Sequence, residues 1–265
     1  MLPFAYVAMG GAGLLGLVVG SFLNVVILRG HSGETLGGRS RCPHCKKNLS
    51  AKELVPLLSF LLQRGRCLHC GTALSLQYPL VEAGTAITFG GIAWYLAPLL
   101  TLSFSSLATM VAALIIASAA IVILVSDLRW MIIPDGAVIL LGVIGIAAAI
   151  TRSLPSSSSL AYDGITALAI TLFFAGLWYV SGGRWMGFGD VKLALATSLL
   201  VGFPASLIAF LFSFWTGAAV GILLLISGRA TLAGKIPFGP FILLGTLIAY
   251  LYSPTLLRIA GFPLY

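Results

Sequence analysis

Charged residues are scarce in this chain. Only 8% of its 265 residues are charged, whereas 59% are hydrophobic and the mean hydropathy is +1.08. An ordinary soluble domain carries about 25% charged residues. The composition therefore excludes an ordinary soluble domain and predicts an all-α polytopic membrane protein.

Several motifs that mark other functions are missing. The chain has neither the HExxH motif of zinc proteases nor the GxSxG motif of serine hydrolases, and its three histidines all lie between residues 31 and 69. It also lacks a glycine-rich dinucleotide-binding motif. These absences exclude the common hydrolytic machineries, and the residue pattern alone indicates no methyltransferase.

The net charge of +8 does not indicate a nucleic-acid partner. Eight of the fifteen basic residues lie between Arg29 and Arg66, directly after the first hydrophobic run. The retention of basic loops in the cytoplasm explains this clustering without nucleic acid.

Eight apolar runs predict eight membrane helices, for which about 20 residues each are needed. The runs cover residues 4–28, 79–98, 104–126, 136–151, 162–181, 191–203, 205–228 and 239–258. The run at 191–203 is short, so we expect a helix that is tilted or partly buried in protein. The predicted domains are transmembrane helix 1 (1–28), a polar zinc-binding insert (29–78) and a seven-helix membrane domain (79–265).

Small residues in the first run predict close helix packing. Gly10, Gly13, Gly16 and Gly20 recur along it and include a GxxxG pair. Such residues let the backbone of another helix approach closely.

Loop charges predict the orientation of the helices. No basic residue precedes the first run and Arg29 follows it, so the first helix should run from outside to inside. Alternating orientations then place thirteen of the fifteen basic residues inside, including Arg229 and Lys235, and only Arg152 and Arg258 outside. We therefore expect both termini to be extracytoplasmic and the polar insert to be cytoplasmic.

All four cysteines lie in the insert, as the pairs Cys42 and Cys45, and Cys67 and Cys70. Each CxxC turn directs two thiolates at one point, and four thiolates saturate a tetrahedral Zn²⁺ ion. Disulfides or free thiols are the alternatives, but the cytoplasm is reducing. A histidine of the insert could replace a ligand, although four cysteines already complete the site. The pattern predicts a structural zinc without an open catalytic position.

Three of the seven acidic residues lie directly beside apolar runs at the predicted cytoplasmic face: Asp127, Asp135 and Asp190. Ionisable groups in such positions are costly and are functional candidates. Asp135 opens an apolar run, and a helix N-cap is the favoured interpretation for it. Asp190 could equally be an N-cap or a functional residue. Its neighbours Gly187 and Gly189 favour function, because they would let a substrate backbone approach closely.

Asp127 has no comparable structural explanation. It ends the run 104–126, where the negative end of the helix dipole disfavours an anion. Pairing with Arg129 is an alternative, although residues two apart on a helix do not face each other. Asp127 and Asp190 at opposite helix ends could share a proton and activate water against an amide bond. The pattern therefore indicates an intramembrane aspartyl protease.

Seven features form a specific combination along nearly the whole chain. They are GSFLNVVILR at 20–29, the two CxxC pairs, VPLLSFLLQRGRC at 55–67, QYPLVE at 77–82, DLRWMIIPD at 127–135, GFGDVK at 187–192 and PFGPF at 237–241. Together they resemble the type IV prepilin peptidases, which are bifunctional leader peptidases and N-methyltransferases of pilus and type II secretion systems.

The resemblance implies an activity and some of its residues. Asp127 and Asp190 would be the catalytic pair, with Asp190 in a GxGD motif. Family substrates, the prepilins and pseudopilins, carry a short basic leader that ends in Gly. It is cut at the cytoplasmic face of the bacterial inner membrane, and the new N-terminal residue is methylated from S-adenosylmethionine. Glu34, Glu53 and Glu82 could receive the basic leader, but solvated surface charge is the favoured interpretation for each.

A transporter or channel is the alternative class of function. The membrane acids would then carry protons or cations, and the zinc insert would be a scaffold. Transporter sites favour the bilayer midplane and broken helices. The acids of this chain mark helix ends instead, which favours the peptidase.

Overall fold

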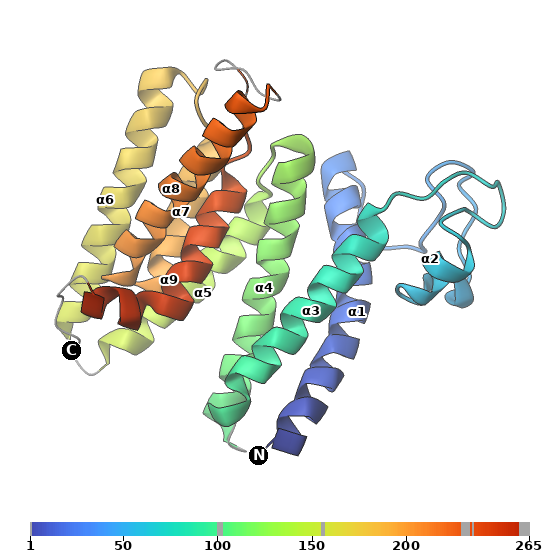
Figure 1. Cartoon of the computed structure of the whole chain (residues 1–265), viewed down its shortest axis with the longest axis horizontal. Coiled ribbons are helices and arrows are strands. Elements are labelled where there is room, and N and C mark those ends of the chain that lie inside the picture. Colours follow the sequence, from blue (N-terminus) through green and yellow to red (C-terminus); the bar gives the residue numbers. More distant parts are fainter. Residues whose placement is uncertain (1, 100–102, 155–156, 229–233, 235, 260–265) are drawn as a thin grey trace. The chain divides into compact units, whose positions relative to one another are not determined.

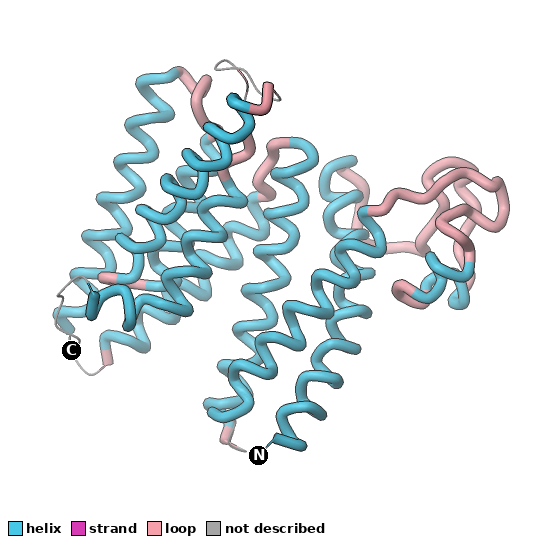
Figure 2. Tube along the Cα trace, in the orientation of Figure 1, coloured by secondary structure: helices cyan, strands magenta, loops and turns pink. Residues whose placement is uncertain are grey.

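The computed structural model describes residues 2–99, 103–154, 157–228, 234 and 236–259 (Figure 1). In this part of the chain helices dominate and strands are absent apart from two isolated bridge pairs (Figure 2). Arg229, Lys235 and residues 260–265 lie outside the described residues, so the sides of the membrane predicted for them stay predictions.

Among the described residues, eight long helices correspond one by one to the eight predicted runs. They are α1 (Leu2–Ser32), α3 (Gln77–Leu96), α4 (Phe104–Trp130), α5 (Asp135–Ser153), α6 (Ser157–Ser181), α7 (Phe188–Val201), α8 (Ala205–Ile226) and α9 (Gly239–Ile259). The insert adds the 3-10 turn η1 (Ala51–Leu54) and α2 (Leu58–Leu62), and the turn η2 (Ala97–Leu99) follows α3.

Five of these helices contain a stretch that is long and apolar enough to cross a membrane: α1, α4, α5, α6 and α8. In α9 a shorter apolar stretch covers Gly239–Tyr252. The all-helical membrane class is therefore confirmed, whereas the count of eight crossings stays a prediction.

The chain divides into two compact units, Met1–Val122 and Ile123–Tyr265, with the boundary inside α4. The predicted division at residues 28 and 78 follows the change from apolar to polar sequence instead. It stays a prediction.

In the first unit, α1 and α3 pack along each other (Figure 1). A Cβ atom on Gly16 would lie 2.7 Å from the Cα of Ala86, and one on Gly20 would lie 2.8 Å from the Cα of Glu82. The predicted close approach is therefore confirmed for these two glycines. Gly10 takes no part in it, because a Cβ there would meet no described atom within 4 Å.

In the second unit, α7 contacts α5, α6, α8 and α9. It buries Val191, Leu193, Ala194 and Ala196 among these neighbours. The expectation that the short run at 191–203 is partly buried in protein is confirmed. The free carbonyl groups at the C-terminal end of α7 consequently need partners from other helices.

A charged network closes the C-terminal end of α7. Arg152 of α5 donates to the carbonyl oxygens of Leu199 and Leu200 at 2.7 and 3.0 Å. Its guanidinium also binds Asp163 of α6, at 3.0 and 3.1 Å, and the second Asp163 oxygen accepts the N–H of Phe203 at 2.6 Å. The sequence did not indicate a role for this buried acid, because Asp163 lies inside an apolar run without a motif.

The glycine packing gives a testable prediction. Gly16→Ala should destabilise the protein by about 1–3 kcal/mol, because its methyl group would overlap the α3 backbone. Gly10→Ala is the matched control on the same helix and should leave stability unchanged or slightly higher. Thermal unfolding of both purified variants checks this. Equal midpoints would show that α1 and α3 do not pack as described.

Candidate active site and metal centre

Asp190 lies buried in the first turn of α7. It is not the N-cap residue, which is Gly187, but its Oδ2 reaches back and accepts the N–H of Gly187 at 3.0 Å. Its other oxygen, Oδ1, is buried and has no hydrogen-bond partner among the described residues. A buried oxygen without a partner costs free energy, which a ligand, a water molecule or a proton bound to it would offset.

Asp127 lies buried in the last turn of α4. The helix continues to Trp130 and so does not end at residue 126 as predicted. The Oδ2 of Asp127 accepts the N–H of Gly239, the first residue of α9, at 2.9 Å. The start of α9 thus supplies a donor and the positive end of a helix dipole. The sequence offered Asp127 no partner in its own helix, and the donor that the structure supplies lies 112 residues away.

A side chain at position 239 would displace the Asp127 carboxylate from this contact. A Cβ atom on Gly239 would lie 2.7 Å from the Oδ2 of Asp127. The preceding Phe238 packs its ring against Phe174 of α6 and Phe214 of α8, with ring centroids 5.9 and 5.3 Å apart. This aromatic packing fixes the start of α9. Gly239 lies in the PFGPF segment, but the sequence alone indicated no role for it.

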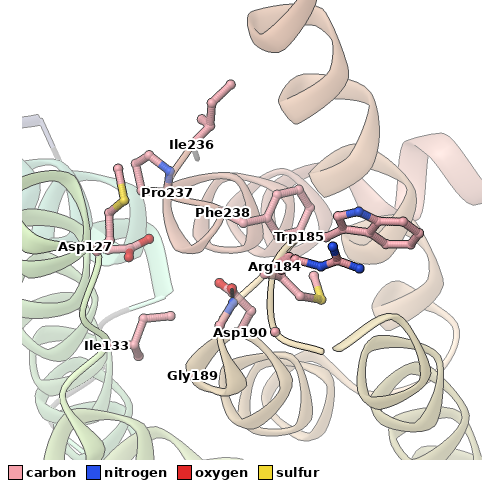
Figure 3. A pocket seen from close by; sticks show the side chains of 13 residues that line it. Asp127, Ile133, Arg184, Trp185, Gly189, Asp190, Ile236, Pro237 and Phe238 are labelled. Atoms are coloured by element: carbon pink, nitrogen blue, oxygen red, sulfur yellow. Dashed lines mark hydrogen bonds between the residues drawn. The ribbon is translucent and has the colours of Figure 1, made fainter. Parts of the chain in front are cut away.

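Both carboxylates line one cavity of about 150 Å³. Figure 3 shows the two side chains directed toward the same space from different helices. The lining is mainly apolar, and its further side chains belong to Met131, Ile133, Arg184, Trp185, Met186, Ile236, Pro237 and Phe238. Since liquid water occupies about 30 Å³ per molecule, the cavity has room for a few waters. Two acids in such surroundings repel each other when both are ionised, which favours the protonation of one of them.

Gly187 and Gly189 line the same cavity. A Cβ atom on Gly189 would lie 2.9 Å from the Cβ of Ile133, so this glycine lets α7 begin directly against Ile133. On Gly187 the nearest atom would be the Oδ2 of Asp190, at 3.7 Å. The approach of a substrate at these glycines stays a prediction.

Asp135 does not cap α5. The N-cap residue is Pro134, and no side-chain cap hydrogen bond is present. The carboxylate of Asp135 instead pairs with the ammonium group of Lys192 on α7. The N-cap prediction is therefore wrong, although the first turn of α5 still suits an anion. The side chain is 68% exposed, which separates Asp135 from the two buried acids.

The four cysteines of the insert lie together. All their Sγ atoms are within 4.8 Å of one another, and those of Cys42 and Cys70 are 3.9 Å apart. A tetrahedral zinc ion with Zn–S bonds of about 2.3 Å would hold its sulfurs about 3.8 Å apart. The cluster therefore fits a zinc ion, and it contains no histidine.

The two CxxC turns have the same backbone pattern. The N–H of Cys42 donates to the carbonyl of Lys47 at 3.0 Å, and that of Cys67 donates to the carbonyl of Thr72 at 2.9 Å. Hydrogen bonds with the hydroxyl and the backbone of Thr72 lower the pKa of the Cys70 thiol to about 6. The thiolate, which binds metals, is thereby favoured at Cys70. At Cys45 a backbone hydrogen bond with Lys47 also acts to lower the pKa of the thiol. Desolvation and the neighbouring thiols of Cys42 and Cys70 act in the opposite direction, and the pKa of Cys45 is raised to about 11.

The three acids of the insert region have different surroundings. Glu34 forms an exposed ion pair, as expected for surface charge. Glu53 accepts the N–H of Ser50 at 2.9 Å, and this bond lowers its pKa. Glu82 is buried, and its Oε2 accepts the N–H of Leu57 at 2.8 Å. The Glu53 side chain is only 7% exposed and also lies 3.3 Å from the Nε2 of His69. The surface-charge interpretation is therefore wrong for Glu53 and for Glu82.

These features together define a class of protein. The chain has helices long and apolar enough to cross a membrane, two buried acids in one cavity, and a cluster of four cysteines. This is an integral membrane protein with a buried acid pair at its helix ends.

Comparisons with known proteins agree with this class. Residues 14–96 match the bacterial peptidase A24 N-terminal domain, and residues 114–222 match the type IV leader peptidase family. A prepilin leader peptidase/N-methyltransferase of Bacillus subtilis (strain 168) is 32% identical over 92% of this chain and 94% of that protein. Proteins of the same name from Aeromonas hydrophila and Pseudomonas aeruginosa are 32% and 30% identical, over 97% and 94% of this chain and 94% and 93% of their own length. No solved structure matches the chain.

The chain therefore belongs to the type IV leader peptidase family. The resemblance noted in its motifs is confirmed. Family membership favours the peptidase hypothesis over the transporter hypothesis.

Proposed function

We propose that this chain is a membrane-embedded aspartyl peptidase. It removes the basic leader of type IV prepilins or pseudopilins after Gly, at the cytoplasmic face of the bacterial inner membrane. The observation that carries the proposal is the buried pair Asp127 and Asp190 in one cavity, with one Asp190 oxygen left without a partner. The names of the curated relatives support the substrate class.

In the proposed reaction, the ionised member of the pair removes a proton from a water molecule in the cavity. The water oxygen attacks the scissile carbonyl carbon, while the protonated member donates to the carbonyl oxygen. Collapse of the tetrahedral intermediate breaks the C–N bond, and the amine of the shortened pilin takes up a proton from the pair. The N–H groups of Gly187 and Gly239 orient the carboxylates by holding one oxygen of each.

We also propose that the chain methylates the new N-terminal amine with S-adenosylmethionine as co-substrate. The curated relatives are named for both activities. The methyl group would pass from the sulfonium to the amine, which loses a proton. No residue of this chain is assigned to binding the methyl donor.

The proposed zinc ion is held by Cys42, Cys45, Cys67 and Cys70, and the spacing of their sulfurs supports it. Bound zinc would join the two CxxC turns and stabilise an insert that has little apolar core. With four thiolate ligands it has no open position for a water molecule, so its role is structural.

The acid pair gives the first prediction. Asp127→Asn and Asp190→Asn should each lower leader cleavage at least about 100-fold, because an amide cannot exchange the proton. Asp135→Asn is the matched control and should retain most activity, because its exposed ion pair contributes only about 0.2–1 kcal/mol. Mass spectrometry of a prepilin incubated with each variant measures the loss of the leader.

Methylation serves as the internal control for these variants. With S-adenosylmethionine and a pre-cleaved pilin, both pair variants should still add the methyl group, which shows that they are folded. Full cleavage by either of them, or an equal loss in Asp135→Asn, would contradict the assignment.

Gly239 gives the second prediction. Gly239→Ala should lower the kcat of cleavage at least about tenfold with little change in KM, because its methyl group would displace the Asp127 carboxylate. Gly136→Ala, in the first turn of α5, is the control, since a Cβ there would meet no described atom within 4 Å. Steady-state kinetics of both variants test this. A kcat in Gly239→Ala equal to that of the control would exclude the positioning role.

The zinc site gives the third prediction. The purified protein should contain about one zinc ion per chain, and Cys67→Ser should lower that content. His44→Ala should keep it, because the cluster contains no histidine. Elemental analysis measures the content. A fully folded protein free of zinc would refute the site.

A further inference from the structure

The insert exposes a run of apolar side chains that the proposed chemistry does not use. We call residues 54–62 the apolar segment; it begins at the last residue of η1 and includes α2. Leu61 and Leu62 are 70% and 75% exposed, and Leu54, Val55 and Leu58 are exposed as well. Contiguous apolar surface of this kind on an otherwise polar region marks a site of interaction.

A partly buried hydrogen bond holds the apolar segment beside α1 and α3. Glu82 of α3 accepts the N–H of Leu57, whose φ of 60° is unusual for a residue with a side chain. Glu82 in turn packs against Gly20 of α1. The segment is therefore fixed to the α1 and α3 pair.

The depth of this bond follows from helix geometry. Gly20 lies nine residues before Arg29, which is about 13 Å along α1, inside the apolar stretch Ala5–Ser32. Glu82 lies five residues after the start of α3 at Gln77, or about 7.5 Å along that helix. The headgroup region of a leaflet is about 5–8 Å thick. With Gln77 at the outer edge of the headgroups, the depth of Glu82 would place Leu57 near the boundary between headgroups and acyl chains. Figure 1 shows α2 level with the C-terminal half of α1.

The charge beside the apolar segment complements an anionic lipid surface. Arg64 and Arg66 follow it directly and are exposed, as is Lys52 before it. Residues 29–78 contain eight basic and two acidic residues, and both acids already have partners. Apolar side chains flanked by basic ones are typical of segments that lie in a membrane interface.

We propose that the apolar segment lies in the interface of the lipid leaflet at the N-terminal end of α3. Leu61 and Leu62 enter the acyl-chain boundary, and Arg64 and Arg66 bind anionic headgroups. The insert is thereby held against the bilayer at the side of α1 and α3. This interaction does not depend on the peptidase or methyltransferase assignment.

The test uses the full chain in nanodiscs of phosphatidylcholine and phosphatidylglycerol. Leu61→Trp places a reporter on the apolar segment, and Leu68→Trp, at a similarly exposed leucine (65%) between Cys67 and Cys70, is the matched control. The fluorescence of the new tryptophan is obtained by subtracting the emission of the parent chain from that of the variant. Lipids brominated near the headgroup end of their acyl chains should quench most of this added fluorescence in Leu61→Trp. They should quench little of that added by Leu68→Trp. Zinc content shows that both inserts are folded.

A second arm tests the charge. In the Leu61→Trp background, replacing Arg64 and Arg66 by Gln should lower the quenching, and omitting phosphatidylglycerol should do the same. At about 1 kcal/mol per basic residue, each arginine changes the interfacial population about fivefold. No quenching of Leu61→Trp in a zinc-loaded protein, or equal quenching of Leu68→Trp, would overturn the proposal. If the tryptophan at position 61 were shielded from water only in nanodiscs that hold two copies of the chain, a second chain and not lipid would cover the apolar segment.

Discussion

The candidate site depends on two backbone N–H groups, each at the start of a helix. Gly187 donates to Asp190 at the start of α7, and Gly239 donates to Asp127 at the start of α9. Burying an ionised carboxylate without hydrogen-bond donors costs too much free energy. A carboxylate whose oxygens all accept hydrogen bonds is held in its ionised form and does not take up a proton. A single neutral donor holds each side chain in position. It also leaves Asp190 with a free oxygen for water or a proton.

The position of Asp190 depends in turn on the other end of α7. This helix has 14 residues and is about 21 Å long, whereas the hydrocarbon core of a bilayer is about 30 Å thick. Its two ends therefore cannot both reach the membrane surfaces, and any end inside the core must find protein partners. Arg152 and Asp163 supply them at the C-terminal end, and Gly187 with Asp190 does so at the N-terminal end.

The helices could be predicted because each follows from a local property, an apolar run bounded by glycine, proline or charge. Asp127 and Asp190 could be selected for the same reason, since a carboxylate beside an apolar run is conspicuous without knowledge of its partner. The partners themselves could not be predicted. Gly239 binds a side chain 112 residues away, and Phe203 binds one 40 residues away.

The wrong prediction for Asp135 has a similar cause. Local sequence favours a cap, but Lys192, 57 residues further along, provides a charged partner that the N-cap rule does not consider. In the same way, the solvated role expected for Glu82 fails because Leu57, 25 residues earlier, folds back onto α3. Local rules locate the acids, and tertiary contacts decide what each acid does.

The basic residues around the cavity show why the acid pair is bonded by backbone groups alone. A cation beside either carboxylate would favour its ionised form and prevent the exchange of a proton. Lys192 lies two residues after Asp190, but its ammonium group pairs with Asp135. Arg184 lines the cavity, yet its Nε donates to the carbonyl of Ser181 at 3.0 Å. Because these cations bind elsewhere, neither carboxylate is held in its ionised form by a neighbouring positive charge.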